Sequence, residues 1–166
     1  MTAVDPFTTH VERASERELV ITRTFRAQPR TVFAALTEPA HLRRWWAPRS
    51  RGVALLEVEA DVRVGGAYRY VFGRPGAPPM AFTGVYREVE PGVRLVYTQI
   101  FEPMRDAGEV VVTSTFAAVP GGTRYVSRER YPSRAVLEGA LASGMEPGMR
   151  ESLDQLAALV VELAAG

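Results

Sequence analysis

Hydrophobic and polar positions first form a regular pattern at residues 18–27, where they alternate. Leu19, Ile21 and Phe25 share one face, and this period of two predicts a β-strand with one buried side. The residues before this strand are mostly polar and follow no period. We therefore expect residues 1–17 to form a flexible N-terminal arm.

Two short helices are predicted next, and each is opened by a proline. Pro29 suits the first turn of a helix, and apolar residues follow it at helical spacing. Pro39 opens a second segment, P-A-H-L-R-R-W-W-A-P, which Pro48 ends. Trp45 and Trp46 fall on the apolar side of this second helix, opposite two arginines.

From residue 53 onward the pattern is that of consecutive strands separated by turns. The alternating runs are Val53–Val62, Ala67–Phe72, Ala81–Glu88, Val93–Phe101, Glu109–Ala117 and Thr123–Tyr131. Short turns such as E-P-G and P-G-G join them, and strands so close in sequence are typical of an antiparallel meander. Gly84, inside the third run, predicts a bulge or a bend.

The chain ends in a predicted amphipathic helix. Apolar residues recur every three or four positions from Met149 onward and form one continuous stripe. Glu146 and Pro147 are suited to the cap and first turn of this helix. A shorter helical segment, Ala135–Leu141, precedes it, with Ser133 as the expected N-cap.

This order of elements limits the folds that the chain can adopt. A twisted antiparallel sheet can coil around one long helix and bury one face of each, while the two short helices close one open end. One helical stripe is too narrow to fill such a sheet. We therefore predict an α+β fold, with about six or seven strands and a cavity between sheet and helix that aromatic residues line.

The composition is that of an ordinary globular protein, and it excludes several kinds of chemistry. The 166 residues, 46% of them hydrophobic, predict a single domain over residues 18–166. The sequence contains no cysteine and no lysine, which excludes disulfides, thiol nucleophiles and lysine Schiff bases. Its two histidines, His10 and His41, are not placed to converge on a metal ion. We expect neither a metal nor a cofactor.

Charge and hydropathy point away from nucleic acid and membranes. The formal net charge is +1, no apolar run reaches the length of a membrane span, and the N-terminus lacks the apolar core of a secretory signal. A cytoplasmic protein is the simplest expectation. Arginines do cluster around the tryptophan pair, as in some nucleic-acid-binding proteins, but a solvated helix face is the better interpretation at this net charge.

Several stretches of the chain resemble one known family. The most specific is V-F-A-A-L-T-E-P-A-H-L-R-R-W-W-A-P; I-T-R-T-F-R-A, D-V-R-V-G-G-A-Y-R-Y, F-T-G-V-Y-R-E-V-E-P-G-V-R-L-V-Y-T, G-G-T-R-Y and G-M-R-E-S-L-D-Q-L support it. Over about residues 18–164 the chain resembles the START-like (SRPBCC) superfamily, and within it domains similar to the activator of heat shock protein 90 ATPase (AHSA-like). Two positions depart from the family pattern: Met149, where tryptophan is more usual, and Val64, where proline is usual.

The resemblance implies a helix-grip fold, in which a curved sheet holds a long C-terminal helix above a deep hydrophobic cavity. It leaves the function open, because the superfamily includes lipid carriers, hormone receptors, polyketide cyclases and aromatases, and proteins that sequester reactive metabolites. The co-chaperone carries a further N-terminal domain that engages its ATPase partner. This sequence has no room for such a domain, so we do not expect it to activate that ATPase.

The residues that we expect to line the cavity are mostly aromatic. Of the pair Trp45 and Trp46, one should pack inward and the other should form the cavity mouth. The remaining candidates are Tyr68, Tyr70, Phe72, Phe82, Tyr97, Gln99, Phe101, Met145 and Met149. Gln99 stands out because an inward-facing amide needs partners, which a ligand or water could supply. Ordinary core packing is the alternative for each of these residues.

Glu129 is the one candidate catalytic residue, and it also belongs to the expected ligand pocket. The family-like register would point it inward together with Tyr125, and an apolar cavity would raise its pKa and suit it to acid–base work. The alternative, which we favour from the sequence alone, is a strand-end glutamate paired with a surface arginine such as Arg128. Arg23, on the inner face of the first strand, is a further candidate partner.

Three functions stay open at this stage. We favour the binding of a small hydrophobic or aromatic molecule in the cavity, without catalysis. The second is a cavity-templated cyclisation, dehydration or hydrolysis of the polyketide cyclase kind, with Glu129 and a tyrosine as acid–base groups. The third is a protein-interaction module related to stress-response co-chaperones. The sequence is also compatible with a homodimer.

Overall fold

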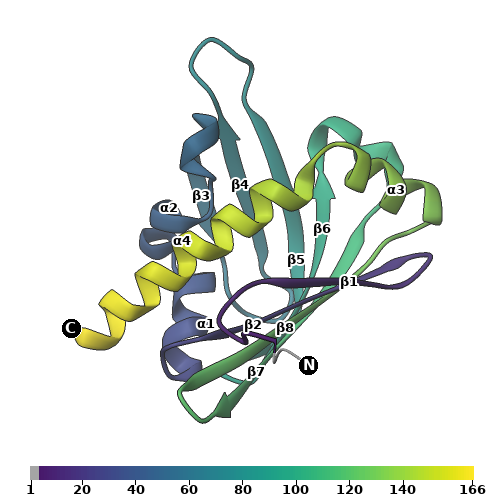
Figure 1. Cartoon of the computed structure of the whole chain (residues 1–166). Helices are drawn as coiled ribbons and strands as arrows, with labels where there is room; N and C mark the ends of the chain where they lie inside the picture. The colour runs from purple at the N-terminus through teal and green to yellow at the C-terminus, as the bar shows by residue number, and fades with distance from the viewer. Residues whose placement is uncertain (1–3) are drawn as a thin grey trace.

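A computed structural model describes residues 4–166 and contains one open sheet of eight antiparallel strands (Figure 1). The strands are β1 (His10–Ser15), β2 (Glu18–Phe25), β3 (Ala54–Ala60), β4 (Ala67–Gly73), β5 (Met80–Glu90), β6 (Arg94–Phe101), β7 (Val110–Val119) and β8 (Gly122–Arg130). They lie in the order β1-β2-β8-β7-β6-β5-β4-β3. The strands from β3 to β8 therefore form the predicted meander, and β2 joins it by pairing with β8.

Helices cover one face of this sheet. They are α1 (Pro29–Thr37), α2 (Pro39–Trp45), α3 (Arg134–Ala142) and α4 (Met145–Ala165), together with the 3₁₀ segments η1 (Arg49–Arg51) and η2 (Glu102–Ala107). Figure 1 shows α4 crossing the curved sheet, with α1 and α2 beside its C-terminal half and α3 at its N-terminal end. This arrangement confirms the predicted α+β helix-grip fold.

The N-terminal segment forms defined structure, and the expectation of a flexible arm is wrong for most of it. His10–Ser15 pairs with β2 as an edge strand, which brings the strand number to eight. Before it, the main-chain N–H of Phe7 donates to the Asp5 side chain at 2.9 Å, and the guanidinium carbon of Arg26 lies 3.6 Å from the Phe7 ring centre. Main-chain pairing needs no hydrophobic period, so the polar pattern concealed this strand. Residues 1–3 of the expected arm lie outside the described residues.

The two C-terminal helices are capped in different ways. Ser133 caps α3 as predicted, because its side chain accepts a hydrogen bond from the main-chain N–H of Val136 at 3.2 Å. The last helix begins at Met145, just before the predicted cap Glu146, and its N-cap is instead Gly144 in the left-handed conformation (φ 82°). Pro147 lies in its first turn, where no main-chain N–H is required.

The main core lies between the concave face of the sheet and the helices. Leu156 and Val160 of α4 are fully buried and belong to the same cluster as Phe25, Phe116 and Tyr125 from the strands. A second buried cluster, which we call the α3 cluster, contains Leu19, Val110, Val112, Tyr131 and Leu137. These two clusters divide the concave face between α4 and α3.

A missing side chain at Gly84 lets an aromatic ring lie across the sheet. A Cβ atom there would lie 1.8 Å from the carbonyl oxygen of Thr98 and 2.7 Å from the ring of Tyr68, its partner on β4. The register shift of β5 falls two positions later, between Tyr86 and Glu88, and not at the glycine. The close approach of Tyr68 therefore explains this glycine.

The buried Arg23 ties the sheet to α4. Its guanidinium donates to the Asp154 carboxylate at 2.5 Å and to the Thr9 hydroxyl at 3.1 Å. The suggestion that Arg23 pairs with Glu129 is wrong, because the register places Arg23 opposite Tyr125 and leaves Glu129 farther along β8.

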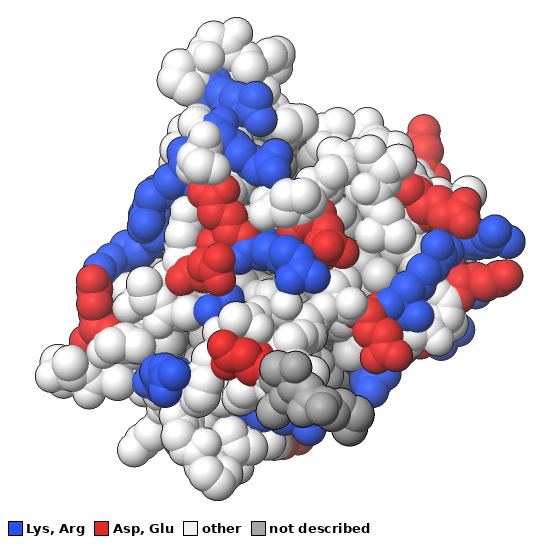
Figure 2. Space-filling model, in the orientation of Figure 1, with Lys and Arg blue, Asp and Glu red and all other residues white. Residues whose placement is uncertain are grey.

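The surface around α4 carries charges of both signs. Figure 2 shows acidic and basic side chains interleaved over this face, and ion pairs such as Arg44–Glu162 join α2 to α4. No helix within residues 4–166 has both the length and the apolar character needed to cross a membrane.

Candidate functional site

A small cavity lies between the sheet and the helices α1 and α2. Its volume is about 50 Å³. Its walls are Leu36, Leu42, Trp45, Trp46, Tyr68, Tyr70, Tyr86, Leu95, Tyr97 and Ser114. A cavity of about 150 Å³ is known to accept benzene, whereas one water needs roughly 10–15 Å³. The space therefore admits a few water molecules as it stands, and an aromatic ligand only if a wall moves.

The two tryptophans of α2 form different parts of this wall. Trp45 is 6% exposed, and its indole N–H donates to the carbonyl of Ala35 at 2.7 Å, which fixes the ring. Trp46 is half-buried, and its ring meets those of Tyr70 and Phe72 with 5.7 and 5.2 Å between centroids. Trp45 is therefore a fixed core residue, while Trp46 lies where the cavity approaches the surface.

Tyrosine hydroxyls make one part of the cavity polar. The Tyr68 hydroxyl donates to the carbonyl of Thr98 at 2.6 Å, whereas the buried Tyr86 hydroxyl lies near that of Tyr70 but makes no well-formed hydrogen bond among the described residues. Burial raises the pKa of Tyr86 and, more strongly, the pKa of Tyr70. These hydroxyls therefore stay protonated at neutral pH, where they can act as hydrogen-bonding groups but not as bases.

Three of the predicted phenylalanines lie beside the cavity and do not line it. Phe72, Phe82 and Phe101 come from β4, β5 and β6, and their neighbouring ring centroids are 5.5 and 5.1 Å apart. All three are half-buried, and both Phe72 and Phe82 contact the ring of Trp46. They continue the aromatic surface from Trp46 toward the β4–β5 loop.

Glu129 lies on the inner face of the sheet, and the surface pairing that we favoured from the sequence is wrong. Arg128 pairs instead with Glu18, at 3.5 Å. The hydroxyl of Tyr131 donates to Oε1 of Glu129 at 3.0 Å. Burial raises the pKa of the Glu129 carboxyl, and the hydrogen bond from Tyr131 opposes part of that rise.

The other predicted polar and methionine residues also lie outside the cavity wall. Gln99 is half-buried on the inner face, and its amide makes no side-chain hydrogen bond within residues 4–166. The sulfur of Met145 lies 3.7 Å from the Tyr131 hydroxyl, while Met149 packs against the main core. Among the same residues, no three His, Asp or Glu side chains converge as a metal site would require.

Sequence reasoning missed several residues of the cavity wall. Tyr86 had a usable signal, because it shares a strand face with Phe82 and Gly84, at alternate positions of β5. Leu36 and Ser114 had none, since a leucine or serine on an inner face is ordinary core material.

Comparisons with known proteins agree with the fold. The model of the family "Activator of Hsp90 ATPase homolog 1-like protein" matches residues 26–161. A comparison with curated proteins gave no significant match.

Solved structures share the whole architecture. A protein from Rhodobacter sphaeroides is 28% identical, with a TM-score of 0.86 over 93% of this chain and 99% of that one. One from Chromobacterium violaceum is 30% identical, with a TM-score of 0.73 over 86% and 96% of the two chains. An AHSA1-like protein from Aeromonas hydrophila, 24% identical with a TM-score of 0.67 over 89% and 94%, shares the fold. Because the family model spans most of the sequence, this chain belongs to the Activator of Hsp90 ATPase homolog 1-like family.

Proposed function

We propose that the protein binds a small hydrophobic or aromatic molecule between the sheet and the helices. The observation that supports this best is the cavity itself, which aromatic rings and leucines line and which contains the Tyr86 hydroxyl, a buried group without a well-formed hydrogen bond among the described residues. A buried hydroxyl without a partner costs about 1–3 kcal/mol, so a fully packed core would not retain one without reason. A polar atom on a ligand, or a water molecule, would relieve this cost.

Among the side chains that line the cavity, the ring of Trp46 can move most easily. The main chain around it is held to α4, since Ser152 donates to the Trp46 carbonyl at 2.8 Å and Gln155 to the Trp45 carbonyl at 2.7 Å. The indole N–H of Trp46 makes no hydrogen bond within residues 4–166. Rotation of this side chain would therefore enlarge the space without disturbing the helix.

A thermal-shift titration with indole and naphthalene tests the proposal. A ligand present at 100 times its dissociation constant stabilises a protein by about 2.7 kcal/mol, so Tm should rise and saturate with concentration. Leu36→Phe adds a ring to the cavity wall, and Val85→Phe adds one at an exposed position, 42% accessible.

We expect wild type and Val85→Phe to respond to the ligands and Leu36→Phe to lose the response. An equal response from Leu36→Phe, or no saturable shift with any ligand in any variant, would refute ligand binding in this cavity.

A second candidate function rests on the Glu129–Tyr131 pair. A carboxyl with a raised pKa, hydrogen-bonded to a phenol at 3.0 Å, is suited to proton transfer in a cyclisation or dehydration. If the protein turns over a bound compound, Glu129→Gln should abolish turnover while the folded state persists. Unchanged turnover in Glu129→Gln would exclude this role.

A further inference from the structure

We propose that the ligand carries a protonated amine, which the Glu129 carboxylate binds while the apolar part of the ligand lies against the aromatic rings. This inference rests on the proposed ligand binding and adds the chemical class of the ligand. Three features of the structure support it: the surroundings of the carboxylate, the engagement of nearby arginines, and the position of Glu129 relative to the cavity.

The carboxylate of Glu129 lies among apolar side chains. The register places Leu19 of β2 on one side of it and Val112 of β7 on the other, and these residues are 2% and 1% exposed. The only side-chain hydrogen bond that Glu129 makes within residues 4–166 comes from the neutral hydroxyl of Tyr131. A carboxyl in such surroundings either takes up a proton or is held ionised by a cationic partner, because one neutral donor does not offset the lost hydration of a carboxylate.

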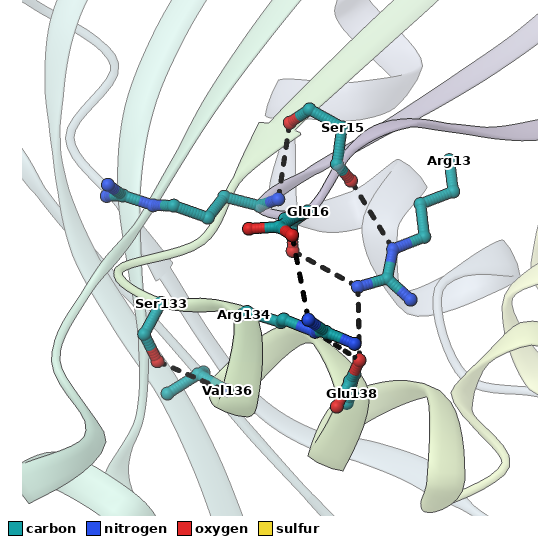
Figure 3. A network of polar contacts seen from close by, with 8 residues as sticks. Arg13, Ser15, Glu16, Ser133, Arg134, Val136 and Glu138 are labelled. Atoms are coloured by element: carbon teal, nitrogen blue, oxygen red, sulfur yellow. Dashed lines mark hydrogen bonds and ion pairs between the residues drawn. The ribbon is translucent and has the colours of Figure 1, made fainter.

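The arginines on the neighbouring elements are engaged elsewhere. Arg13 of β1 points to Glu138 of α3, at 3.5 Å, and donates to the carbonyls of Ser15 and Glu16, in the network of Figure 3. Arg134 joins the same network through Glu138.

Other arginines near this end of the sheet are engaged as well, and Arg17 donates to the carbonyl of Tyr131 at 3.0 Å. Arg150 of α4 binds Glu146 at 3.2 Å and the carbonyl of Thr9 at 2.7 Å, and Arg23 binds Asp154. The sequence contains no lysine that could serve instead. Within residues 4–166 Glu129 forms no ion pair, so a cation that completes this site would come from a bound ligand.

The position of Glu129 fits a ligand that reaches from the cavity. Glu129, Val112, Tyr97 and Tyr86 are successive partners across β8, β7, β6 and β5, so their side chains share the concave face. Two strand spacings, about 10 Å, separate Glu129 from Tyr97, and Tyr97 lines the cavity. Both residues are only half-buried. A molecule with an aromatic ring beside Tyr97 and a short alkyl chain across Val112 can bring an ammonium group to Glu129.

Three probes that share one apolar body test the inference. They are 4-phenylbutylamine, 4-phenylbutanol and 4-phenylbutyrate, which at pH 7.5 carry a positive charge, no charge and a negative charge. Calorimetric titration of wild type should rank their affinities in that order, with the amine at least about tenfold tighter than the alcohol, since hydrogen bonds to charged groups contribute about 1.5–3 kcal/mol.

Glu129→Gln removes the charge and keeps both the shape and the acceptor for Tyr131. We expect this variant to bind the amine and the alcohol within about threefold of each other, while its affinity for the alcohol stays that of wild type. The matched control is Glu90→Gln on β5, an exposed glutamate with no ion pair within residues 4–166, which should leave all three affinities unchanged.

The outcomes separate this inference from the proposed function. Equal binding of amine and alcohol by wild type, or an amine preference that survives Glu129→Gln, overturns the amine inference and leaves ligand binding intact. If wild type binds none of the three probes and shows no saturable shift with indole, both the amine inference and the proposed function are refuted. If Glu129→Gln does not fold, the ranking of the three probes on wild type still decides.

Discussion

Truncation of the two tryptophans of α2 should have unequal costs. Trp45→Ala removes a ring that is 6% exposed and leaves the Ala35 carbonyl without its donor at 2.7 Å. Replacing a buried tryptophan by alanine costs about 3–5 kcal/mol, and the lost hydrogen bond adds about 1 kcal/mol. We expect Trp45→Ala to lower the free energy of unfolding by about 4–6 kcal/mol, close to the whole stability of a marginal domain.

Trp46→Ala should cost only about 2–3 kcal/mol, because its ring is half-buried and makes no side-chain hydrogen bond within residues 4–166. Its removal adds the volume of an indole ring to the existing cavity of about 50 Å³. Free indole should therefore bind this variant more tightly than wild type and restore part of the lost stability.

Equilibrium unfolding in guanidinium chloride measures both effects. Far-ultraviolet circular dichroism is the appropriate signal, since each variant loses a fluorescent tryptophan. Arg43→Ala, at an exposed position of the same helix, is the control and should change the free energy of unfolding by less than about 0.5 kcal/mol. Equal costs for the two tryptophans, or an unfolding midpoint of Trp46→Ala that indole does not move, would refute the assignment of Trp46 as the movable wall.

Three further predictions follow from individual contacts. Gly84→Ala should destabilise the protein by more than about 3 kcal/mol, because the added Cβ would lie 1.8 Å from the carbonyl oxygen of Thr98 on β6. Gly139→Ala, in open space on α3, should stabilise it by up to about 1 kcal/mol. Urea unfolding compares the two variants, and similar costs would contradict the packing at Gly84. Burial raises the pKa of Glu129, so its contribution to stability is fully present below its unfolded-state pKa and is lost as pH rises through its folded-state pKa. Glu129→Gln should therefore raise Tm near pH 8 and change it little near pH 4, and calorimetry showing the reverse trend would exclude the raised pKa. Tyr68→Phe should cost about 1 kcal/mol through the hydrogen bond of 2.6 Å that it loses, while Tyr86→Phe should be neutral or stabilising; denaturation curves that reverse this order would contradict the unpaired state of the Tyr86 hydroxyl.

The parts of the fold that follow from periodicity were predictable from the sequence. The apolar stripe of α4 indicated Leu156 and Val160, which are fully buried, and alternation located seven of the eight strands, six of them in one continuous meander. The edge strand His10–Ser15 was not predictable in this way, because its stability comes from main-chain hydrogen bonds to β2 and its side chains are largely exposed.

The candidate site was harder to predict because its properties depend on contacts between distant segments. The inner-face register of Glu129 followed from alternation, but its environment is decided by Leu19 and Val112 on other strands, so the expected surface pairing failed. The size of the cavity depends on how far rings such as Trp46 and Tyr70 turn toward each other. Residue types do not determine such angles, and a few tenths of an ångström in packing decide whether a hollow remains.

The entry of a molecule into the space between sheet and helices can be measured most directly by NMR of leucine methyl groups during a titration with indole. The predicted result is saturable shifts and intermolecular nuclear Overhauser effects at Leu36, Leu42 and Leu95, which line the cavity. The exposed Leu56 of β3, 50% accessible, serves as the internal control and should show neither. Effects that are absent from the three cavity leucines, or that are largest at Leu56, would contradict binding in this cavity.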